Sequence, residues 1–201
     1  MNEIENKLSA ANSSLIIDMP FLGALVLRMP LIAADPAWCK TTGTDARAIY
    51  YNPEYIGELT LAQTQFVLAH EALHCALSHF ARRQHRIKHR WDLACDLAIN
   101  PILIKDGLVP PPEAFSIDVY ENMSAEEIYP LLDDNEDMQT QDHHLYDKEN
   151  DDPADKLQQP NQSSQSQGSG SADAEIDKNA GGAPQPKPLD GKEKEELAIQ
   201  W

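Results

Sequence analysis

The sequence has few cysteines and lacks an uninterrupted apolar run long enough to cross a membrane. Its three cysteines, Cys39, Cys75 and Cys95, include no Cys-x-x-Cys pair. A disulfide scaffold is therefore excluded, and reduced, mostly buried thiols are predicted. The apolar stretch at residues 19–34 is interrupted by one arginine and two prolines, so it is unsuited to span a bilayer. The acidic N-terminus lacks the basic segment of a signal peptide, so we expect a cytoplasmic protein.

Positive charge is scarce, since 16 Lys and Arg residues face 33 Asp and Glu residues and the net charge is −17. Such a surface repels phosphate groups, so we expect no nucleic-acid partner, and without a spanning segment we expect no membrane partner. One basic patch at residues 82–90 is interpreted as a solvated helix end followed by a turn. The alternative is a contact with an acidic partner or with the acidic tail of the chain itself.

The acidic side chains are unevenly distributed along the chain. Residues 133–201 carry 17 acidic and 6 basic side chains and are rich in Asp, Gln, Ser, Pro, Gly and Asn. Such a segment buries too little apolar surface to offset its ordering entropy. We therefore predict a folded domain at residues 1–133 and a disordered acidic linker at residues 134–190. Residues 191–201 are interpreted as the start of a truncated C-terminal segment.

Apolar spacing and turn residues predict a mainly helical α+β domain with a small sheet. Thr60 and Gln63 have the spacing of a capping box, and a helix of about 20 residues is expected to follow. A second box, from Ser124 to Glu127, is expected to open a short helix. The other predicted elements are helices at 3–17, 20–27 and from 91 onward, strands at 30–34 and 47–51, and a turn at 41–45.

The long predicted helix carries the pentapeptide His70-Glu71-Ala72-Leu73-His74. Positions four apart lie on one helix face, so His70 and His74 can bind a single zinc ion, and Glu71 can act as general base on a zinc-bound water. The motif arises by chance in roughly one chain in a hundred of this length. Burying these side chains without partners is costly, which favours a metal site over two hydrogen-bonded core histidines and a solvated glutamate.

A zinc site that activates water needs a third protein ligand. Asp96, on the next apolar helix, is the preferred candidate. Asn100 or Asp92, one turn away on either side, is expected to hydrogen bond to a metal-ligating histidine. Asp92, Asp96 and Asn100 follow one another at intervals of four residues, so they lie on one helix face and the roles of Asp92 and Asp96 could be exchanged.

The remaining histidines near the motif are weaker candidates for the third ligand. On a continuous helix His79 points about 140° away from His74, so it is expected at the surface. His85 and His89 lie in the basic turn and could reach back toward the site, although nothing in the sequence fixes them there.

Three sequence blocks resemble a bacterial family of HExxH metallopeptidase domains that normally precede a von Willebrand factor A-like domain. The blocks are residues 45–53, 66–74 and 91–100, and residues 123–129 resemble the family's closing block. The resemblance covers residues 15–132 and implies a zincin-like fold. It also implies that His70 and His74 are zinc ligands, Glu71 the base and Asp96 the third ligand. By analogy with the family, a MoxR-type AAA+ ATPase or the von Willebrand factor A-like domain is the expected partner.

The expected reaction is hydrolysis of a peptide or protein substrate. A zinc-activated water would attack the peptide carbonyl, and Glu71 would pass its proton to the leaving amine. The strand at 47–51 is predicted to be a sheet edge that pairs with an extended substrate. Tyr50 and Tyr51 are the substrate-binding candidates, with packing as the alternative for both.

A rival function is a non-catalytic, zinc-stabilised binding or assembly module that works with a von Willebrand factor A-like domain or a MoxR-type ATPase. The two functions differ at the fourth zinc position. A position open to water indicates a hydrolase, whereas a position filled by Cys or His indicates a structural site.

Overall fold

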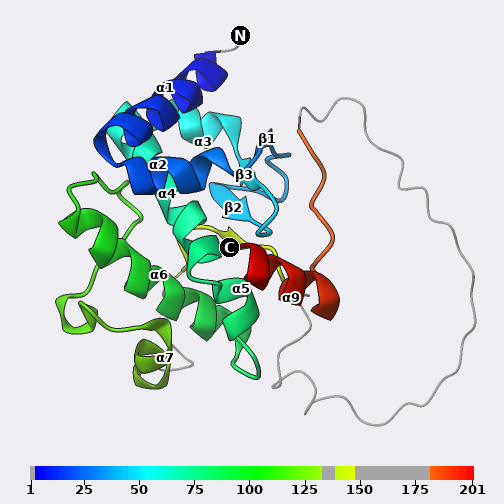
Figure 1. Ribbon diagram of the computed structural model, residues 1–201. Helices are drawn as coiled ribbons and strands as arrows, with labels where there is room; N and C mark the ends of the chain where they lie inside the picture. Colours follow the sequence, from blue (N-terminus) through cyan, green and yellow to red (C-terminus); the bar gives the residue numbers. More distant parts are fainter. Residues whose placement is uncertain (1–2, 133–138, 148–181) are drawn as a thin grey trace, which may run out of the picture.

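A computed structural model describes residues 3–132, 139–147 and 182–201 (Figure 1). The α+β class predicted from the sequence is confirmed, because the structure combines helices with a small four-stranded sheet. The helices are α1 (Glu3–Asp18), α2 (Pro20–Leu27), α3 (Pro53–Glu58), α4 (Leu61–Ala76), α5 (His79–Arg82), α6 (Lys88–Lys105), α7 (Ala125–Ile128) and α9 (Gly191–Gln200). The strands are β1 (Leu31–Ala33), β2 (Thr42–Thr44), β3 (Ile49–Tyr51) and β4 (His143–His144), and the short 3-10 turns are η1 (Asp118–Tyr120) and η2 (Tyr129–Leu131).

Helix α4 is the centre of the fold, and it begins where the sequence predicts. The Thr60 side chain accepts a hydrogen bond from the Gln63 N–H, and the Gln63 side chain accepts one from the Thr60 N–H, which confirms the capping box. Helices α1, α2 and α6 and strands β2 and β3 all contact α4. Every residue from Phe66 to Cys75 is consequently buried, as expected of a helix surrounded by protein.

The sheet has the strand order β1-β3-β2-β4, so β3 is a central strand. It pairs in parallel with β1, where Leu31 lies opposite Ile49, and antiparallel with β2, where Thr42 lies opposite Tyr51. The prediction that residues 47–51 form an edge open to substrate is therefore wrong. The physical reason is β2, since Thr42–Thr44 have turn chemistry in the sequence but pair between β3 and β4 in the structure.

Helix α6 packs between α4 and α7. Trp91, Leu93 and Leu97 of α6 form a buried apolar cluster with Ile128 of α7. Asp96 and Asn100 also lie on α6, are fully buried, and contact histidines of α4. The packing of α6 against two helices thus buries polar groups on the side that meets α4.

Two stretches within the predicted disordered linker have defined structure. At residues 139–147, β4 pairs in parallel with β2, and Tyr146 is buried in the main core. At residues 182–190, Ala183 forms a parallel bridge with Ala34, and Leu189 is buried. The structure differs from the predicted continuous linker at these residues, because sheet pairing and a few apolar side chains fix them. The rest of that linker, residues 134–138 and 148–181, lies outside the described residues.

Residues 191–201, interpreted from the sequence as a truncated segment, form helix α9 and its C-cap. The Asp190 side chain caps the helix by accepting a hydrogen bond from the Glu193 N–H (2.8 Å). The Trp201 indole N–H donates to the Ala46 carbonyl oxygen (3.1 Å), and the Arg28 guanidinium lies over the indole ring. These contacts dock α9 on the folded domain.

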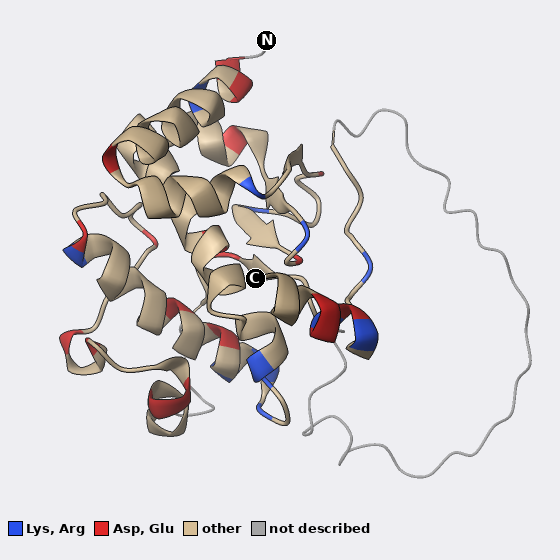
Figure 2. Cartoon of the chain, viewed as in Figure 1, with Lys and Arg blue, Asp and Glu red and all other residues tan. Residues whose placement is uncertain are grey.

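Basic side chains gather at the turn between α5 and α6 (Figure 2). Arg83 pairs with Asp147 (2.7 Å), Lys88 pairs with Asp92 (2.8 Å), and Arg82 pairs with an acidic residue of α7. These three cations therefore contact acidic side chains of the same chain. Asp147 belongs to the acidic C-terminal segment, so the alternative interpretation of the basic patch applies to that pair.

Two expectations from composition can be compared with the described residues. The three cysteines are free and buried, as predicted. Among the helices in the described ranges, none combines the length and the apolar character needed to cross a membrane.

Candidate metal centre

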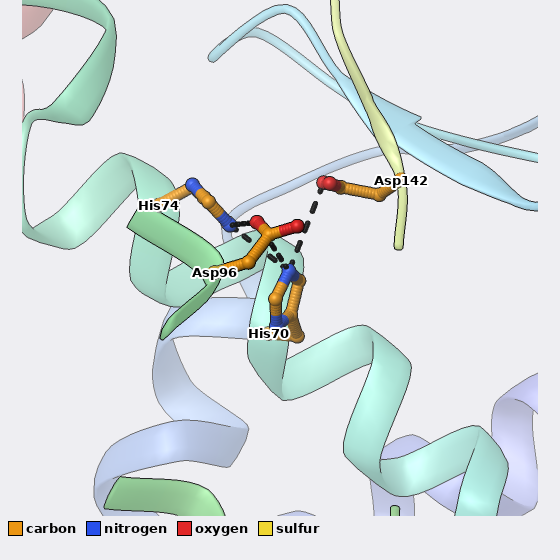
Figure 3. Close-up of side chains that lie close together, drawn as sticks. All are labelled: His70, His74, Asp96 and Asp142. Carbon is orange, nitrogen blue, oxygen red and sulfur yellow. Dashed lines mark hydrogen bonds and ion pairs between the residues drawn. The ribbon is translucent and has the colours of Figure 1, made fainter. Parts of the chain in front are cut away.

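A group of imidazoles and carboxylates lies where α4 and α6 meet the residues before β4 (Figure 3). Helix α4 contributes His70 and His74, α6 contributes Asp96, and Asp142 directly precedes β4. One nitrogen or oxygen atom from each residue lies within 4.8 Å of all the others. All four side chains are buried. These four residues, called the His/Asp cluster below, form a group that could hold a metal ion.

The donor atoms of the His/Asp cluster converge on one point. The Nε2 atoms of His70 and His74 lie 2.9 Å apart, as expected for side chains one turn apart on a helix. Asp96 Oδ1 lies 3.3 Å from His74 Nε2 and 3.6 Å from His70 Nε2. Asp142 Oδ2 lies 3.8 Å from His70 Nε2. The sequence prediction of His70, His74 and Asp96 thus names three residues that the structure brings together.

The chemistry of these donors fits a metal ion. Asp96 Oδ1 and both carboxylate oxygens of Asp142 are buried, and apart from contacts with imidazoles they accept no hydrogen bond within the described ranges. Buried carboxylates without hydrogen bonds are costly, and a cation at their point of convergence would satisfy them. Imidazole nitrogen and carboxylate oxygen are common ligands of zinc and of other divalent transition metals.

Both motif histidines contact a polar group through the nitrogen that points away from the cluster. His70 Nδ1 lies 3.0 Å from Asn100 Oδ1. His74 Nδ1 lies 3.2 Å from His79 Nδ1. Contacts of this kind fix the orientation of the ring and leave Nε2 for a metal ion. Asn100 therefore occupies the position that the sequence assigns to a residue steadying a histidine.

A third histidine, which sequence reasoning missed, faces the cluster. His144 Nε2 lies 3.3 Å from His74 Nε2 and 3.1 Å from Asp142 Oδ1. The other ring nitrogen of His144 lies 3.0 Å from Asp92 Oδ1. Asp92 thus contacts a histidine of β4 rather than one of the motif. The available signal for these residues is the Asp-His-His triplet at 142–144, which lies in a stretch whose composition predicts disorder.

Glu71 is fully buried, and neither of its carboxylate oxygens has a hydrogen-bond partner in the described part of the chain. Burial, reinforced by the negative charge of Asp142, raises the pKa of Glu71 well above its usual range, while the charge on His70 opposes the shift. A divalent cation nearby would favour the ionised form. A carboxylate that is shielded from bulk water and has a raised pKa is suited to accept a proton from a reacting group.

The two motif histidines differ in how readily they bind a proton. Burial disfavours the charged form of both rings. At His70, the nearby carboxylates of Asp142 and Asp96 outweigh burial and raise the pKa to about 10. At His74, burial and the positive charge of His144 lower the pKa to about 4. The two carboxylates thus favour a cation at this place, and a metal ion would compete there with the proton on His70.

The expectation that His79 lies at the surface is wrong, because the motif helix does not continue to it. Helix α4 ends at Ala76, and Ser78 adopts a left-handed conformation with φ of 54°. The chain then turns into α5, which begins at His79. His79 is 2% exposed and directs its ring toward His74.

Substitution of Ser78 tests whether this break in the helix positions His79. Ser78→Val is expected to lower the free energy of unfolding by roughly 1–2 kcal/mol, because a β-branched side chain clashes in the left-handed region. Ser78→Gly is the matched control and should be at least as stable as the wild type, because glycine accepts a positive φ without strain. Urea unfolding of the three proteins gives the comparison. Equal stability of the Val and Gly variants would contradict the role of this conformation.

The remaining candidate residues lie outside the His/Asp cluster. Tyr50 and Tyr51 are buried in β3, where the Tyr50 hydroxyl donates to Asp45 Oδ2 (3.3 Å) and Tyr51 packs in the main core. Their assignment as substrate-binding residues stays a prediction. His85 and His89 are exposed and are not members of the cluster.

Comparison with known proteins gives the family. The chain belongs to the family described as "Putative metallopeptidase domain", which it matches over residues 3–200. A protein of Thermotoga maritima, described as uncharacterized, is 44% identical over 54 residues, a segment that covers 26% of this chain and 14% of the relative. No solved structure matches the chain significantly. The match extends beyond residues 15–132, to which the sequence blocks limit the resemblance.

Proposed function

We propose that this protein is a zinc-dependent metallopeptidase. One observation carries the proposal: the HExxH helix and Asp96 of α6 bring their donor atoms together in a buried group, beside a glutamate whose carboxylate has no partner in the described ranges. The family to which the chain belongs carries the description "Putative metallopeptidase domain", which supports the same proposal.

In this proposal His70, His74 and Asp96 hold the zinc ion. When bound there, zinc supplies Lewis-acid polarisation of a peptide carbonyl and lowers the pKa of water. Side chains of the protein orient the ligands and transfer the proton. Asn100 and His79 hold the rings of His70 and His74 in place through their Nδ1 atoms.

Glu71 moves the proton. Its carboxylate would accept a proton from the attacking water and deliver it to the amine nitrogen that leaves, so that the same oxygen serves as base and then as acid. The buried position of Glu71 excludes bulk water from this transfer.

Peptide cleavage is expected to depend on zinc. The test is to strip the protein with a chelator, add zinc back in steps, and measure new amino termini released from an unfolded protein substrate by mass spectrometry. Cleavage should be lost on stripping and should return until about one zinc per chain is bound. The stripped protein should also unfold at a lower temperature, because the cluster carboxylates then lack a cation. Cleavage that survives complete stripping would contradict the proposal.

A second candidate function is a non-catalytic, zinc-stabilised binding or assembly module. It is favoured by Asp142 and His144, which face the two motif histidines in addition to Asp96, since a metal surrounded by protein donors is typical of structural sites. A von Willebrand factor A-like domain or a MoxR-type ATPase would be its partner. For this function, zinc removal should lower the unfolding temperature, but the zinc-loaded protein should release no new amino termini from any substrate.

A further inference from the structure

Residues 139–147, called the strap below, run from the His/Asp cluster through β4 to the main core. They carry both Asp142 and His144 into contact with groups of α4 and α6. We propose that Asp142 and His144 are metal ligands, and that the strap thereby closes the metal site in its resting state. This inference rests on the proposed metal site at His70, His74 and Asp96.

The first support is the convergence of His144 with the cluster. Its Nε2 atom lies 3.3 Å from His74 Nε2, 3.1 Å from Asp142 Oδ1 and 3.7 Å from Asp96 Oδ1. One nitrogen of this ring therefore faces a motif histidine and both carboxylates of the cluster. These are the separations expected of atoms that share a single ion, since ligand atoms about 2 Å from a metal lie roughly 3–4 Å from one another.

The second support is that His144 is oriented as metal-bound histidines are. Its Nδ1 atom lies 3.0 Å from Asp92 Oδ1, and the other oxygen of Asp92 pairs with Lys88 Nζ (2.8 Å). A carboxylate behind a histidine fixes the ring and leaves Nε2 for the metal. Asp92 is accordingly a positioning residue for His144, as Asn100 is for His70.

The third support is the way in which the strap is fixed. At its start, the Gln141 N–H donates to Asp96 Oδ2 (3.0 Å). In the middle, the Leu145 N–H donates to the Thr44 carbonyl oxygen of β2 (3.0 Å). At its end, Asp147 pairs with Arg83 (2.7 Å) and also with a lysine of α9. Both donors of the strap are therefore held in place on either side by contacts with the folded domain.

The fourth support is a cavity on the outer side of the strap. Its volume is about 240 Å³, and Asp92, Asp142 and His144 contribute to its wall. His70, His74, Asp96 and Glu71 are not among its lining residues. The strap thus stands between this cavity and the motif residues. A peptide entering from the cavity meets Asp142 and His144 first, so the strap must move away before the peptide can be cleaved. The rate of cleavage therefore depends on the fraction of molecules in which the strap has moved away from the metal site.

The experiment uses the whole 201-residue chain loaded with cobalt, and it counts metal ligands without reference to activity. X-ray absorption should give three imidazole ligands in the wild type and two in His144→Gln. Acetohydroxamate should leave the visible cobalt spectrum of the wild type unchanged. It should bind at least about tenfold more tightly to Asp142→Asn and His144→Gln, because in these variants the strap no longer closes the metal site. Loss of cobalt from His144→Gln with an unchanged circular dichroism spectrum would likewise support ligation.

Two further variants separate closure from a general loss of structure. Asp147→Asn removes the anchor at the end of the strap without touching a donor, and it should also strengthen acetohydroxamate binding. Asp106→Asn, an exposed change on the far end of α6, is the matched control and should behave as the wild type. Asp92→Asn should weaken cobalt binding by roughly 10–100-fold, as expected when the partner behind a ligand is lost.

The outcomes distinguish this inference from the proposed function. Two imidazoles in both wild type and His144→Gln, or equal acetohydroxamate binding by wild type and strap variants, would overturn the closed site and leave the metallopeptidase proposal standing. A wild-type protein that takes up neither cobalt nor zinc would overturn both.

Discussion

Glu71→Gln is expected to reduce peptide cleavage by roughly 10²–10⁴-fold while the zinc content stays the same. Glutamine keeps the volume of the side chain but cannot accept a proton at neutral pH. The loss follows from the position of Glu71, whose buried carboxylate interacts electrostatically with Asp142, His70 and His144 of the metal centre. The measurement is the initial rate of cleavage of an unfolded protein substrate, with zinc determined on the same samples.

Glu58→Gln is the matched control for this variant. Glu58 is an exposed residue at the end of α3, so the same chemical change should leave both rate and zinc content unaltered. An unfolding midpoint of Glu71→Gln equal to that of the wild type would show that the lost rate reflects proton transfer rather than folding. A Glu71→Gln protein that cleaves at the wild-type rate would refute the role of Glu71 as general base.

The central part of the fold could be predicted because it is specified by local sequence. Thr60 and Gln63 mark the start of α4, and the absence of Gly and Pro after them permits a long buried helix. Strand β2 could not be predicted in this way. Thr42–Thr44 gain their extended conformation from pairing with β3 on one side and with β4, about 100 residues later, on the other. Pairing over such a distance leaves no local signal.

The candidate site likewise contains residues that could be predicted from the sequence and residues that could not. His70 and His74 are brought together by helix periodicity, and Asp96 follows from the need for a third ligand on a neighbouring helix. The break at Ser78, which turns His79 inward, depends on a single left-handed residue and is not encoded by periodicity. Asp142 and His144 reach the cluster through β4, so composition alone misassigns them to a disordered segment.

Asp96→Ala is expected to lower zinc affinity by more than roughly 100-fold, beyond the 10–100-fold loss that follows removal of a partner behind a ligand. Asp96 Oδ1 lies within 3.3–3.7 Å of the Nε2 atoms of His70, His74 and His144, so it is the carboxylate that all three rings share. Its removal takes away a ligand and also one of the negative charges that offset a dication in this buried place. Zinc stoichiometry after dialysis against a weak chelator measures the effect.

The zinc loss of Asp96→Ala is to be compared with that of two other variants. His74→Ala removes a ligand of the HExxH motif and should lose zinc as completely as Asp96→Ala. Asn100→Ala removes only the contact behind His70, so its loss should lie in the 10–100-fold range. An Asp96→Ala protein that retains full zinc would exclude Asp96 as the third ligand. The strap would then be the remaining source of that ligand, because Asp142 and His144 already face the two motif histidines. Ranking these variants by how much zinc each one loses therefore decides whether the ion is held chiefly by α4 and α6 or by α4 and the strap.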